Sequence, residues 1–233
     1  MGFFTYKEYI KDGKKVLKVN ILPERYCTFD CIFCPCGRTS NKQETQTDFP
    51  GNDDAILELE KILDEKKNQI DIVFLNSKGE ALLNKRVGDI IDLIKRKNKP
   101  IRLLSNGYLL GKDPYKKIAQ KCDEVIGEVR VVTDKDFQKT HRPLLGYTFD
   151  EHISNMAEFK KEYFGTFILE INILKGYSDT DLAVEKLKEI INIIKPDIVK
   201  VEPMEDERFM KKYGIEEERL QKIKATLEKP PKC

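Results

Sequence analysis

The sequence contains no tryptophan and only two histidines, and it has no long apolar run. No stretch approaches the roughly 18 consecutive apolar residues that a helix needs to span a bilayer, so we expect no membrane segment. The N-terminal residues also lack the apolar core of a secretory signal, which favours a cytoplasmic protein. The two histidines, His141 and His152, are not at the spacing of paired histidine ligands in zinc sites.

The chain also lacks an excess of either charge. Lys and Arg total 42 and Asp and Glu total 40 in 233 residues, which gives a formal net charge of +2. Proteins that bind nucleic acids usually carry a clear basic excess, so this balance does not favour that class. The length suits one domain with a large core, and we expect a single domain over residues 1–233.

Cysteine is scarce outside one short segment. Four of the six cysteines lie within residues 25–39, RYCTFDCIFCPCGRT: Cys27, Cys31, Cys34 and Cys36. In a reducing compartment, clustered cysteines are metal ligands more often than disulfides. The segment is therefore a candidate metal site, with zinc and an iron–sulfur cluster as the main alternatives and disulfides as the third.

Strand-like and helix-like segments alternate along the chain. Residues 4–21 predict a β-hairpin, because Asp12-Gly13 suits a tight turn with positive φ. Runs of β-branched and apolar residues predict further strands at 70–75, 101–104, 124–132, 166–174 and 197–202. Amphipathic patterns predict helices at about 53–68, 86–97, 113–121, 150–163, 180–194 and 216–228.

This alternation predicts an α/β fold in which six core strands are each followed by a helix. A complete eight-unit barrel needs about 250 residues, so we expect a partial (βα)6 TIM-like barrel, open on one side. It covers about residues 15–205, with the N-terminal β-hairpin at its start and a C-terminal helix in the tail 206–233. Chemistry in such folds lies at the carboxyl ends of the strands, and the cysteine segment follows the first core strand.

The spacing of the cysteines distinguishes the metals. Zinc bound by all four would form a cramped site, whereas three cysteines spaced x3 and x2 match a [4Fe–4S] cluster that keeps one iron open. The pattern Cys27-x3-Cys31-x2-Cys34, with aromatic Phe33 before the last cysteine, resembles that of the radical S-adenosylmethionine (SAM) superfamily. The resemblance implies that these three cysteines bind the cluster, that SAM binds its open iron, and that Phe33 contacts SAM.

A second segment resembles a motif of the same superfamily. NSKGEALL, after the second core strand, is similar to a Gly-Gly-Glu motif with Lys78 in place of the first glycine. The resemblance implies that Glu80 holds the amino group of SAM. Gly79 would permit the close approach of the backbone that a ligand needs.

A third segment, LSNGYLL after the third core strand, resembles a Thr-Asn-Gly segment of the superfamily. It implies that Ser105 and Asn106 approach the ribose of SAM. The resemblance covers roughly residues 15–205 and is nearest to a subgroup around the wyosine-forming tRNA enzymes.

Other polar side chains near the ends of strands are candidate SAM contacts. Glu170 and Asn172 alternate with apolar residues in LEINI, so both can point into the barrel. Buried polar groups need partners, which SAM or an internal salt bridge would supply. Asp134 and Glu202, expected at the ends of the fourth and sixth strands, are further candidates.

Three cysteines fall outside the expected ligand set. Cys36 is expected to be a bystander, because SAM already fills the fourth coordination site, although it would serve as a spare ligand in protein without SAM. Cys122 follows an amphipathic helix and is expected to fill the core. Cys233 is the last residue and would ligate a neighbouring molecule's metal or nothing.

The resemblance also implies an enzymatic mechanism. An electron from the reduced cluster cleaves SAM to methionine and a 5′-deoxyadenosyl radical, which takes a hydrogen atom from a substrate, while the protein positions the reactants and excludes water. An external electron donor of the ferredoxin or flavodoxin type is implied as a partner. A zinc-stabilised binding module without catalysis is the alternative from another class.

Several substrate classes are consistent with the sequence. The nearest subgroup suggests a tRNA base, and the alternatives are activation of a glycyl-radical protein, modification of a peptide and a step in building a small cofactor. A partial barrel leaves a lateral gap, whereas small metabolites are better served by a sealed cavity. We therefore expect a macromolecular substrate or partner, tRNA or protein, with the C-terminal helix beside the opening. The alternative is that the tail or a second copy of the chain caps the gap.

Overall fold

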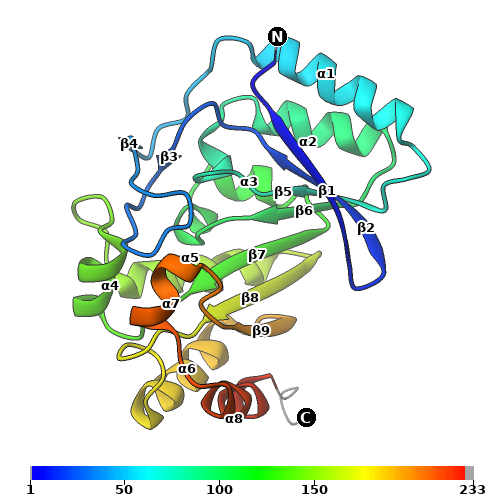
Figure 1. Ribbon diagram of the computed structural model, residues 1–233. Coiled ribbons are helices and arrows are strands. Elements are labelled where there is room, and N and C mark those ends of the chain that lie inside the picture. The colour runs from blue at the N-terminus through cyan, green and yellow to red at the C-terminus, as the bar shows by residue number, and fades with distance from the viewer. Residues whose placement is uncertain (1, 229–233) are drawn as a thin grey trace.

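The computed structural model describes residues 2–228, which form one large sheet with helices around its outside (Figure 1). The strand order is β1-β2-β5-β6-β7-β8-β9. The hairpin of β1 (Thr5–Lys11) and β2 (Lys14–Asn20) is antiparallel, and all later neighbours are parallel. The remaining strands are β5 (Ile72–Leu75), β6 (Ile101–Leu104), β7 (Glu124–Val129), β8 (Thr166–Asn172) and β9 (Ile198–Glu202).

The helices of the described residues are α1 (Asn52–Glu65), α2 (Val87–Arg96), α3 (Tyr115–Ala119), α4 (Asp134–His141), α5 (Phe149–Glu162), α6 (Asp181–Ile194), α7 (Glu207–Tyr213) and α8 (Glu217–Leu227). Helices α1 to α6 lie between successive strands of the sheet and pack around its outside, and α7 and α8 follow the last strand. The apolar core between sheet and helices includes Leu17, Val73 and Leu169, all fully buried. The apolar faces expected from the sequence therefore serve one common core.

The parallel strands β2 and β5 to β9 confirm the predicted partial (βα)6 barrel. β1 and β9 form the two edges of the sheet, which curves without closing, and Figure 1 shows these edges apart. Inside the curve, toward the amino ends of the strands, a small separate apolar cluster fills the interior. Its buried members are Val16, Ile72, Phe74, Ile126 and Ile168.

The chain between β7 and α5 differs from the prediction. The strand expected at 124–132 ends at Val129, and α4 follows in a segment for which we predicted no helix. The side chain of Thr133 caps α4 by accepting a hydrogen bond from the backbone N–H of Asp136. Asp134 and Asp136 in the first turn then stabilise the helix dipole. A capping threonine followed by acidic residues is a sequence pattern that predicts a helix start, and we overlooked it because we extended the strand to residue 132.

The predicted helical tail forms two helices instead of one. Gly214 separates them, with an extended backbone that ends α7. A Cβ at this position would lie 2.6 Å from the carbonyl oxygen of Met210, which favours glycine there. Cys233 lies outside the described residues. Within residues 2–228, no helix has both the length and the apolar character to cross a membrane.

Candidate functional site

A cavity of about 830 Å³ lies at the carboxyl ends of the strands. Its wall combines the cysteine segment with residues of the β1–β2 hairpin, the loops after β5 and β6, and the ends of β7, β8 and β9. This position matches the location expected for chemistry in such a fold. The cavity therefore brings together parts of the chain that are far apart in sequence.

Two sets of backbone hydrogen bonds hold the cysteine segment in place. Near its start, β3 (Tyr26–Cys27) pairs in parallel with β4 (Asn41–Lys42), which lies just after the segment. In the middle, the backbone N–H groups of Asp30 and Ile32 donate to the carbonyl oxygens of His141 and Thr140 at the end of α4, both at 2.9 Å. The unexpected helix α4 thus anchors the loop that carries the cysteines.

All three predicted ligands, Cys27, Cys31 and Cys34, line the cavity, and so does Cys36. Burial raises the pKa of Cys27 to about 12 and also raises that of Cys31, to which the neighbouring thiol and carboxylate charges add. A hydrogen bond from the Cys36 thiol lowers the pKa of Cys34 to about 6. Two buried thiols stay neutral unless a cation is near, and a bound metal would deprotonate them.

The distances between possible metal-binding side chains help to distinguish a zinc site from an iron–sulfur cluster. Among residues 2–228, no three His, Cys, Asp or Glu side chains come close enough together to hold a single metal ion. A structural zinc site needs four ligands around one ion, about 2.3 Å away for sulfur. A [4Fe–4S] cluster instead takes thiolates at separate irons. Three separated thiols on one cavity wall fit the cluster better than the zinc alternative.

Glu80 connects the loops after β5 and β6. It is 2% exposed, and its Oε2 accepts hydrogen bonds from Ser105 Oγ at 3.0 Å and from Asn106 N at 2.9 Å. Its Oε1 accepts a third from Leu82 N at 3.2 Å. Burial raises the pKa of Glu80 to about 7, against the opposing effect of these three donors. Because two carboxylate oxygens offer about four acceptor sites, one remains for a ligand in the cavity.

Gly79 and Asn106 tie these loops to the cysteine segment. A Cβ at Gly79 would lie 2.1 Å from the carbonyl oxygen of Tyr26, and the next residue donates its N–H to that same oxygen at 2.8 Å. Gly79 therefore allows close approach of the cysteine segment, in addition to lining the cavity. The amide of Asn106 donates to Thr28 Oγ1 at 2.9 Å and lies 3.6 Å from Cys27 Sγ.

Comparison with known families agrees with this arrangement. Residues 21–191, most of the chain, match the model of the radical SAM superfamily. The chain belongs to the radical SAM superfamily. It is therefore an enzyme whose cofactors are a [4Fe–4S] cluster and SAM, and the resemblance drawn from the cysteine pattern is confirmed.

Relatives of this radical SAM protein are remote. A protein named GTPase Obg of Brachyspira hyodysenteriae is 28% identical over 186 residues, 79% of this chain and 27% of that protein. The UPF0026 protein MJ1312 of Methanocaldococcus jannaschii is 25% identical over 183 residues, 78% of this chain and 57% of that protein. The wyosine-forming enzyme TYW1, solved with a lysine–pyruvate adduct bound, superposes with a TM-score of 0.68 at 12% identity, over 91% of this chain and 72% of that chain. The chain thus spans less than two thirds of the length of its curated relatives, and the structural likeness shows a shared fold.

The residues around the thiols fit the anionic cluster of a radical SAM enzyme. Arg25 donates from Nη2 to Cys34 Sγ at 3.3 Å, while its Nε and Nη1 are buried without a hydrogen-bond partner. Buried cationic N–H groups without acceptors are unfavourable in the protein alone. A cluster bound by thiolates would bring negative charge to this position.

The structure brings most of the predicted SAM contacts to the same cavity. Phe33, Glu170, Asn172 and Glu202 all line it. Asn172 Nδ2 donates to Glu170 Oε1 at 3.0 Å. The two predicted residues are thus partners of each other, through a hydrogen bond within the protein. The backbone carbonyl of Glu202 accepts a hydrogen bond from Ile173 N at 3.0 Å. Its side chain makes no hydrogen bond or ion pair with another described residue, which leaves the carboxylate available to a ligand.

Asp134 is not part of this group. The structure places it in the first turn of α4 rather than at a strand end, because β7 ends five residues earlier. Its Oδ1 accepts hydrogen bonds from Phe149 N at 2.8 Å and from Gln138 Nε2 at 3.3 Å. The first bond joins the start of α4 to the start of α5, and the second lies within α4. The expectation that Asp134 ends the fourth strand is therefore wrong. Cys122, by contrast, lies in the apolar core as expected.

Sequence analysis missed a charged pair inside the cavity. Glu128 and Arg130 both line it, and Arg130 Nη2 donates to Glu128 Oε1. The guanidinium also lies 5.1 Å from the centre of the Phe33 ring. The signal was present in EVIGEVR, where Glu128 and Arg130 stand two positions apart and so share one face of the strand.

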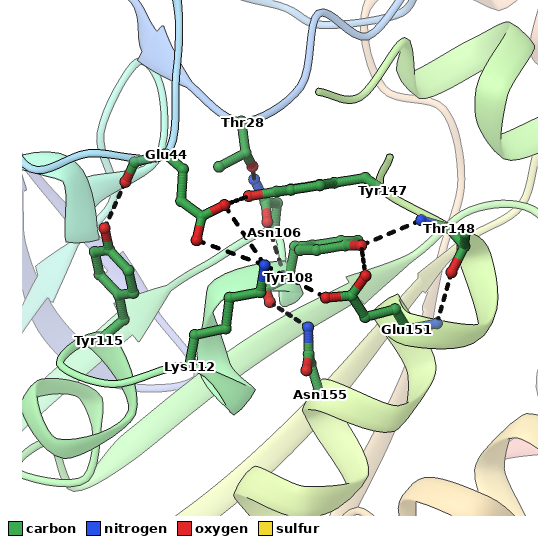
Figure 2. A network of polar contacts seen from close by, with 10 residues as sticks. All are labelled: Thr28, Glu44, Asn106, Tyr108, Lys112, Tyr115, Tyr147, Thr148, Glu151 and Asn155. Carbon is green, nitrogen blue, oxygen red and sulfur yellow. Dashed lines mark hydrogen bonds and ion pairs between the residues drawn. The ribbon is translucent and has the colours of Figure 1, made fainter. Parts of the chain in front are cut away.

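A network of polar and aromatic side chains lies next to the cysteine segment and connects it to neighbouring helices (Figure 2). Tyr108 stacks on Tyr147 with ring centres 3.7 Å apart, and the Nζ of Lys112 lies 4.7 Å from the Tyr147 ring. Glu44, which follows the cysteine segment, accepts a hydrogen bond from the hydroxyl of Tyr147. Asn106 donates to Thr28 of the segment in the same view. The network therefore joins the segment to the short 3-10 helix η2 (Tyr108–Gly111), to α3 and to the start of α5.

Proposed function

We propose that this chain cleaves SAM reductively, with the cluster bound by Cys27, Cys31 and Cys34 and with SAM in the 830 Å³ cavity. When bound, the reduced cluster supplies the electron that releases methionine and a 5′-deoxyadenosyl radical, which takes a hydrogen atom from the substrate. The observation that carries the proposal is the meeting of three thiols from one loop with the Glu80–Ser105–Asn106 network.

In this proposal the protein's own residues bind and orient SAM. Glu80 accepts a hydrogen bond from the amino group at its remaining acceptor site, and its three protein donors keep the carboxylate in place. Asn106 holds the adjoining loop beside Cys27. Glu170 and Asn172 offer polar atoms for the ribose from the opposite wall. Phe33 keeps water away from the cluster side, because it is 2% exposed and packs against His141.

Anaerobic reconstitution tests this function directly. The wild-type protein should bind about four irons and four sulfides, show broad iron–thiolate absorption, and release 5′-deoxyadenosine from SAM on reduction. Alanine at Cys27, Cys31 or Cys34 should abolish all three properties. Cys36→Ala and Cys122→Ala are matched controls that should retain the cluster. A wild-type protein that takes up zinc but no iron, and yields no 5′-deoxyadenosine, would refute the proposal.

We further propose that the substrate is macromolecular, with a tRNA base as the first candidate. The open sheet supports this, because the edges β1 and β9 stay apart and no strand follows β9 within the described residues. α8 lies beside the edge strand, where Glu228 Oε1 accepts a hydrogen bond from Val201 N at 2.7 Å. One cavity wall also carries Lys11, Lys18 and Lys78, whose side chains make no ion pair, which suits a substrate with phosphates.

Mass spectrometry of a deletion strain tests the substrate proposal. We expect one modified tRNA nucleoside to disappear and its unmodified precursor to accumulate. Restoration of the nucleoside by the wild-type gene, but not by a Cys31→Ala gene, would tie the change to the cluster. Unchanged nucleosides alongside a lost peptide modification or a lost cofactor would replace tRNA by one of the other substrate classes.

Two further parts of the proposal concern the cellular setting. An external donor of the ferredoxin or flavodoxin type would supply the electron to the cluster. A cytoplasmic location is supported by clustered cysteines without disulfides. Activity with a purified ferredoxin or flavodoxin system, compared with a chemical reductant, would test the first part.

A further inference from the structure

Arg25 stands out among the cations near the cysteine segment because its guanidinium is incompletely satisfied. The segment contains one other arginine, Arg38, which is 76% exposed and forms an ion pair with Asp30 at 2.7 Å. Arg25 forms no ion pair with any described carboxylate. Its one side-chain hydrogen bond goes from Nη2 to Cys34 Sγ at 3.3 Å. Two arginines of one loop thus differ sharply in their surroundings.

The remaining N–H groups of Arg25 are buried and unpaired. Both Nε and Nη1 are shielded from solvent and have no hydrogen-bond partner. A Cβ at Gly37 would lie 3.5 Å from Nη1, so the end of the segment closes over the guanidinium. Leaving a buried charged donor without an acceptor destabilises the protein, because the group has lost its hydrogen bonds to water. The buried, unpaired N–H groups of Arg25 are therefore suited to hydrogen-bond an anionic group that binds at the cysteine segment.

We propose that Arg25 is a positioning residue that sets the reduction potential of the cluster, by donating hydrogen bonds to the sulfur atoms at the Cys34 corner. This inference rests on the proposed binding of the cluster by Cys27, Cys31 and Cys34. Hydrogen bonds to cluster sulfurs and nearby charge are among the factors that set the potential of such centres. Adding an electron makes the cluster more negative, so a cationic donor stabilises the reduced form and raises the potential.

The test is a redox titration of anaerobically reconstituted protein, followed by electron paramagnetic resonance of the reduced cluster. Arg25→Gln should shift the midpoint potential to a more negative value while iron and sulfide per chain stay equal to wild type. Arg25→Lys keeps the charge but loses the fork of donors, so its potential should fall between the two. Arg38→Gln removes a cation from the same segment without touching sulfur, and its potential should match wild type.

The outcomes separate this inference from the proposed function. Equal potentials in wild type, Arg25→Gln and Arg25→Lys, at equal iron content, would overturn it while leaving the function intact. Loss of iron from both Arg25 variants, with unchanged circular dichroism, would assign Arg25 to assembly of the segment and would also overturn it. Wild-type protein that binds no iron would instead refute the proposed function itself.

Discussion

The two ends of the partial barrel are built on opposite principles. Toward the amino ends of the strands, the interior holds the apolar cluster around Ile72, Ile126 and Ile168, and its charges are paired: Arg102 forms an ion pair with Glu124 and lies 5.7 Å from the centre of the Phe74 ring. Toward the carboxyl ends lies a cavity whose wall carries thiols and charged side chains among its apolar residues. One end of the sheet is closed by packing, and the other is kept open.

The difference between the ends also appears in how polar groups are satisfied. At the open end, Arg25 keeps two N–H groups without partners, the carboxylate of Glu202 bonds to no described residue, and burial raises the pKa of Glu80. Natural proteins pair most of their buried polar groups, so an accumulation of exceptions marks a functional site. The well-packed amino end of the barrel contributes stability that offsets the unfavourable free energy of these unpaired and buried polar groups. Mutations at the two ends should therefore have separable effects.

The largest effect at the open end is expected for Gly79→Ala. The added Cβ would lie 2.1 Å from the carbonyl oxygen of Tyr26, and both atoms belong to backbone that cannot move independently. The cysteine segment must then shift, which should abolish iron binding and cost about 2 to 4 kcal/mol of stability. Iron analysis after reconstitution and urea unfolding measure these two results.

Gly88→Ala is the matched control for this substitution. A Cβ at Gly88, inside α2, meets no atom within 4 Å. The change should leave iron binding intact and raise the free energy of unfolding by about 0.5 to 1 kcal/mol, because alanine is the better helix former. Iron binding by Gly79→Ala at the wild-type level would show that the loop accommodates the extra atom.

At the closed end, Ile168→Ala should show the reverse pattern. Ile168 is 2% exposed and belongs to the interior cluster, away from the cavity. Deleting its outer carbons should lower the free energy of unfolding by about 2 to 5 kcal/mol, and Ile168→Val by about 0.5 to 1.5 kcal/mol. Folded protein should still bind a full cluster. Loss of iron in proportion to loss of stability would mean that the two ends are not separable.

The contrast between the ends also explains what the sequence could predict. Helix positions could be predicted from the periodic spacing of apolar residues. Strand positions could be predicted from short continuous apolar runs, which reflect burial on both faces of the sheet, as in the fully buried β5. The three cysteines proposed as cluster ligands stand in one short segment, so their proximity could be predicted without the fold. Arg25 lies in the same segment, yet its two unpaired N–H groups depend on how residues from Gly37 fold back over it.

Other parts of the site depend on long-range geometry. The error on Asp134 arose because a β-branched run was extended to Val132, whereas Thr133 starts a helix. The pairing of Glu128 with Arg130 was visible only as alternation within an apparently apolar strand. Residues that meet across the cavity come from different strands, and single-sequence patterns specify spacing along the chain better than distance across a sheet.

A smaller effect at the open end concerns the pH dependence of stability in protein without cluster and SAM. Burial raises the pKa of Glu80 from 4.5 to about 7, so the folded state holds this proton more tightly than the unfolded state. The resulting stability is present below pH 4.5 and is lost as the pH rises through about 7, a contribution of about 3 kcal/mol since each pKa unit corresponds to about 1.4 kcal/mol. Glu80→Gln should remove this slope.

Urea unfolding at about pH 5 and about pH 8 measures the slope for both proteins. The wild type should lose more stability than Glu80→Gln between these conditions, and the difference between the two slopes isolates Glu80 from the other carboxyl groups. Parallel pH profiles would mean that the three hydrogen-bond donors offset the effect of burial completely.

The smallest predicted effect tests whether the network behind the cysteine segment supports stability or the site itself. Tyr147→Phe keeps the ring that stacks on Tyr108 and removes only the hydrogen bond to Glu44. The free energy of unfolding should fall by about 1 kcal/mol, the usual contribution of one such bond, and iron binding should not change. Tyr163→Phe is the control, because it removes one hydrogen bond of the same kind, from the Tyr163 hydroxyl to the carbonyl oxygen of Cys122 at 2.8 Å, and Tyr163 does not line the cavity. If Tyr147→Phe loses iron while Tyr163→Phe does not, Glu44 positions the cysteine segment, and residues behind the cavity walls belong to the functional site.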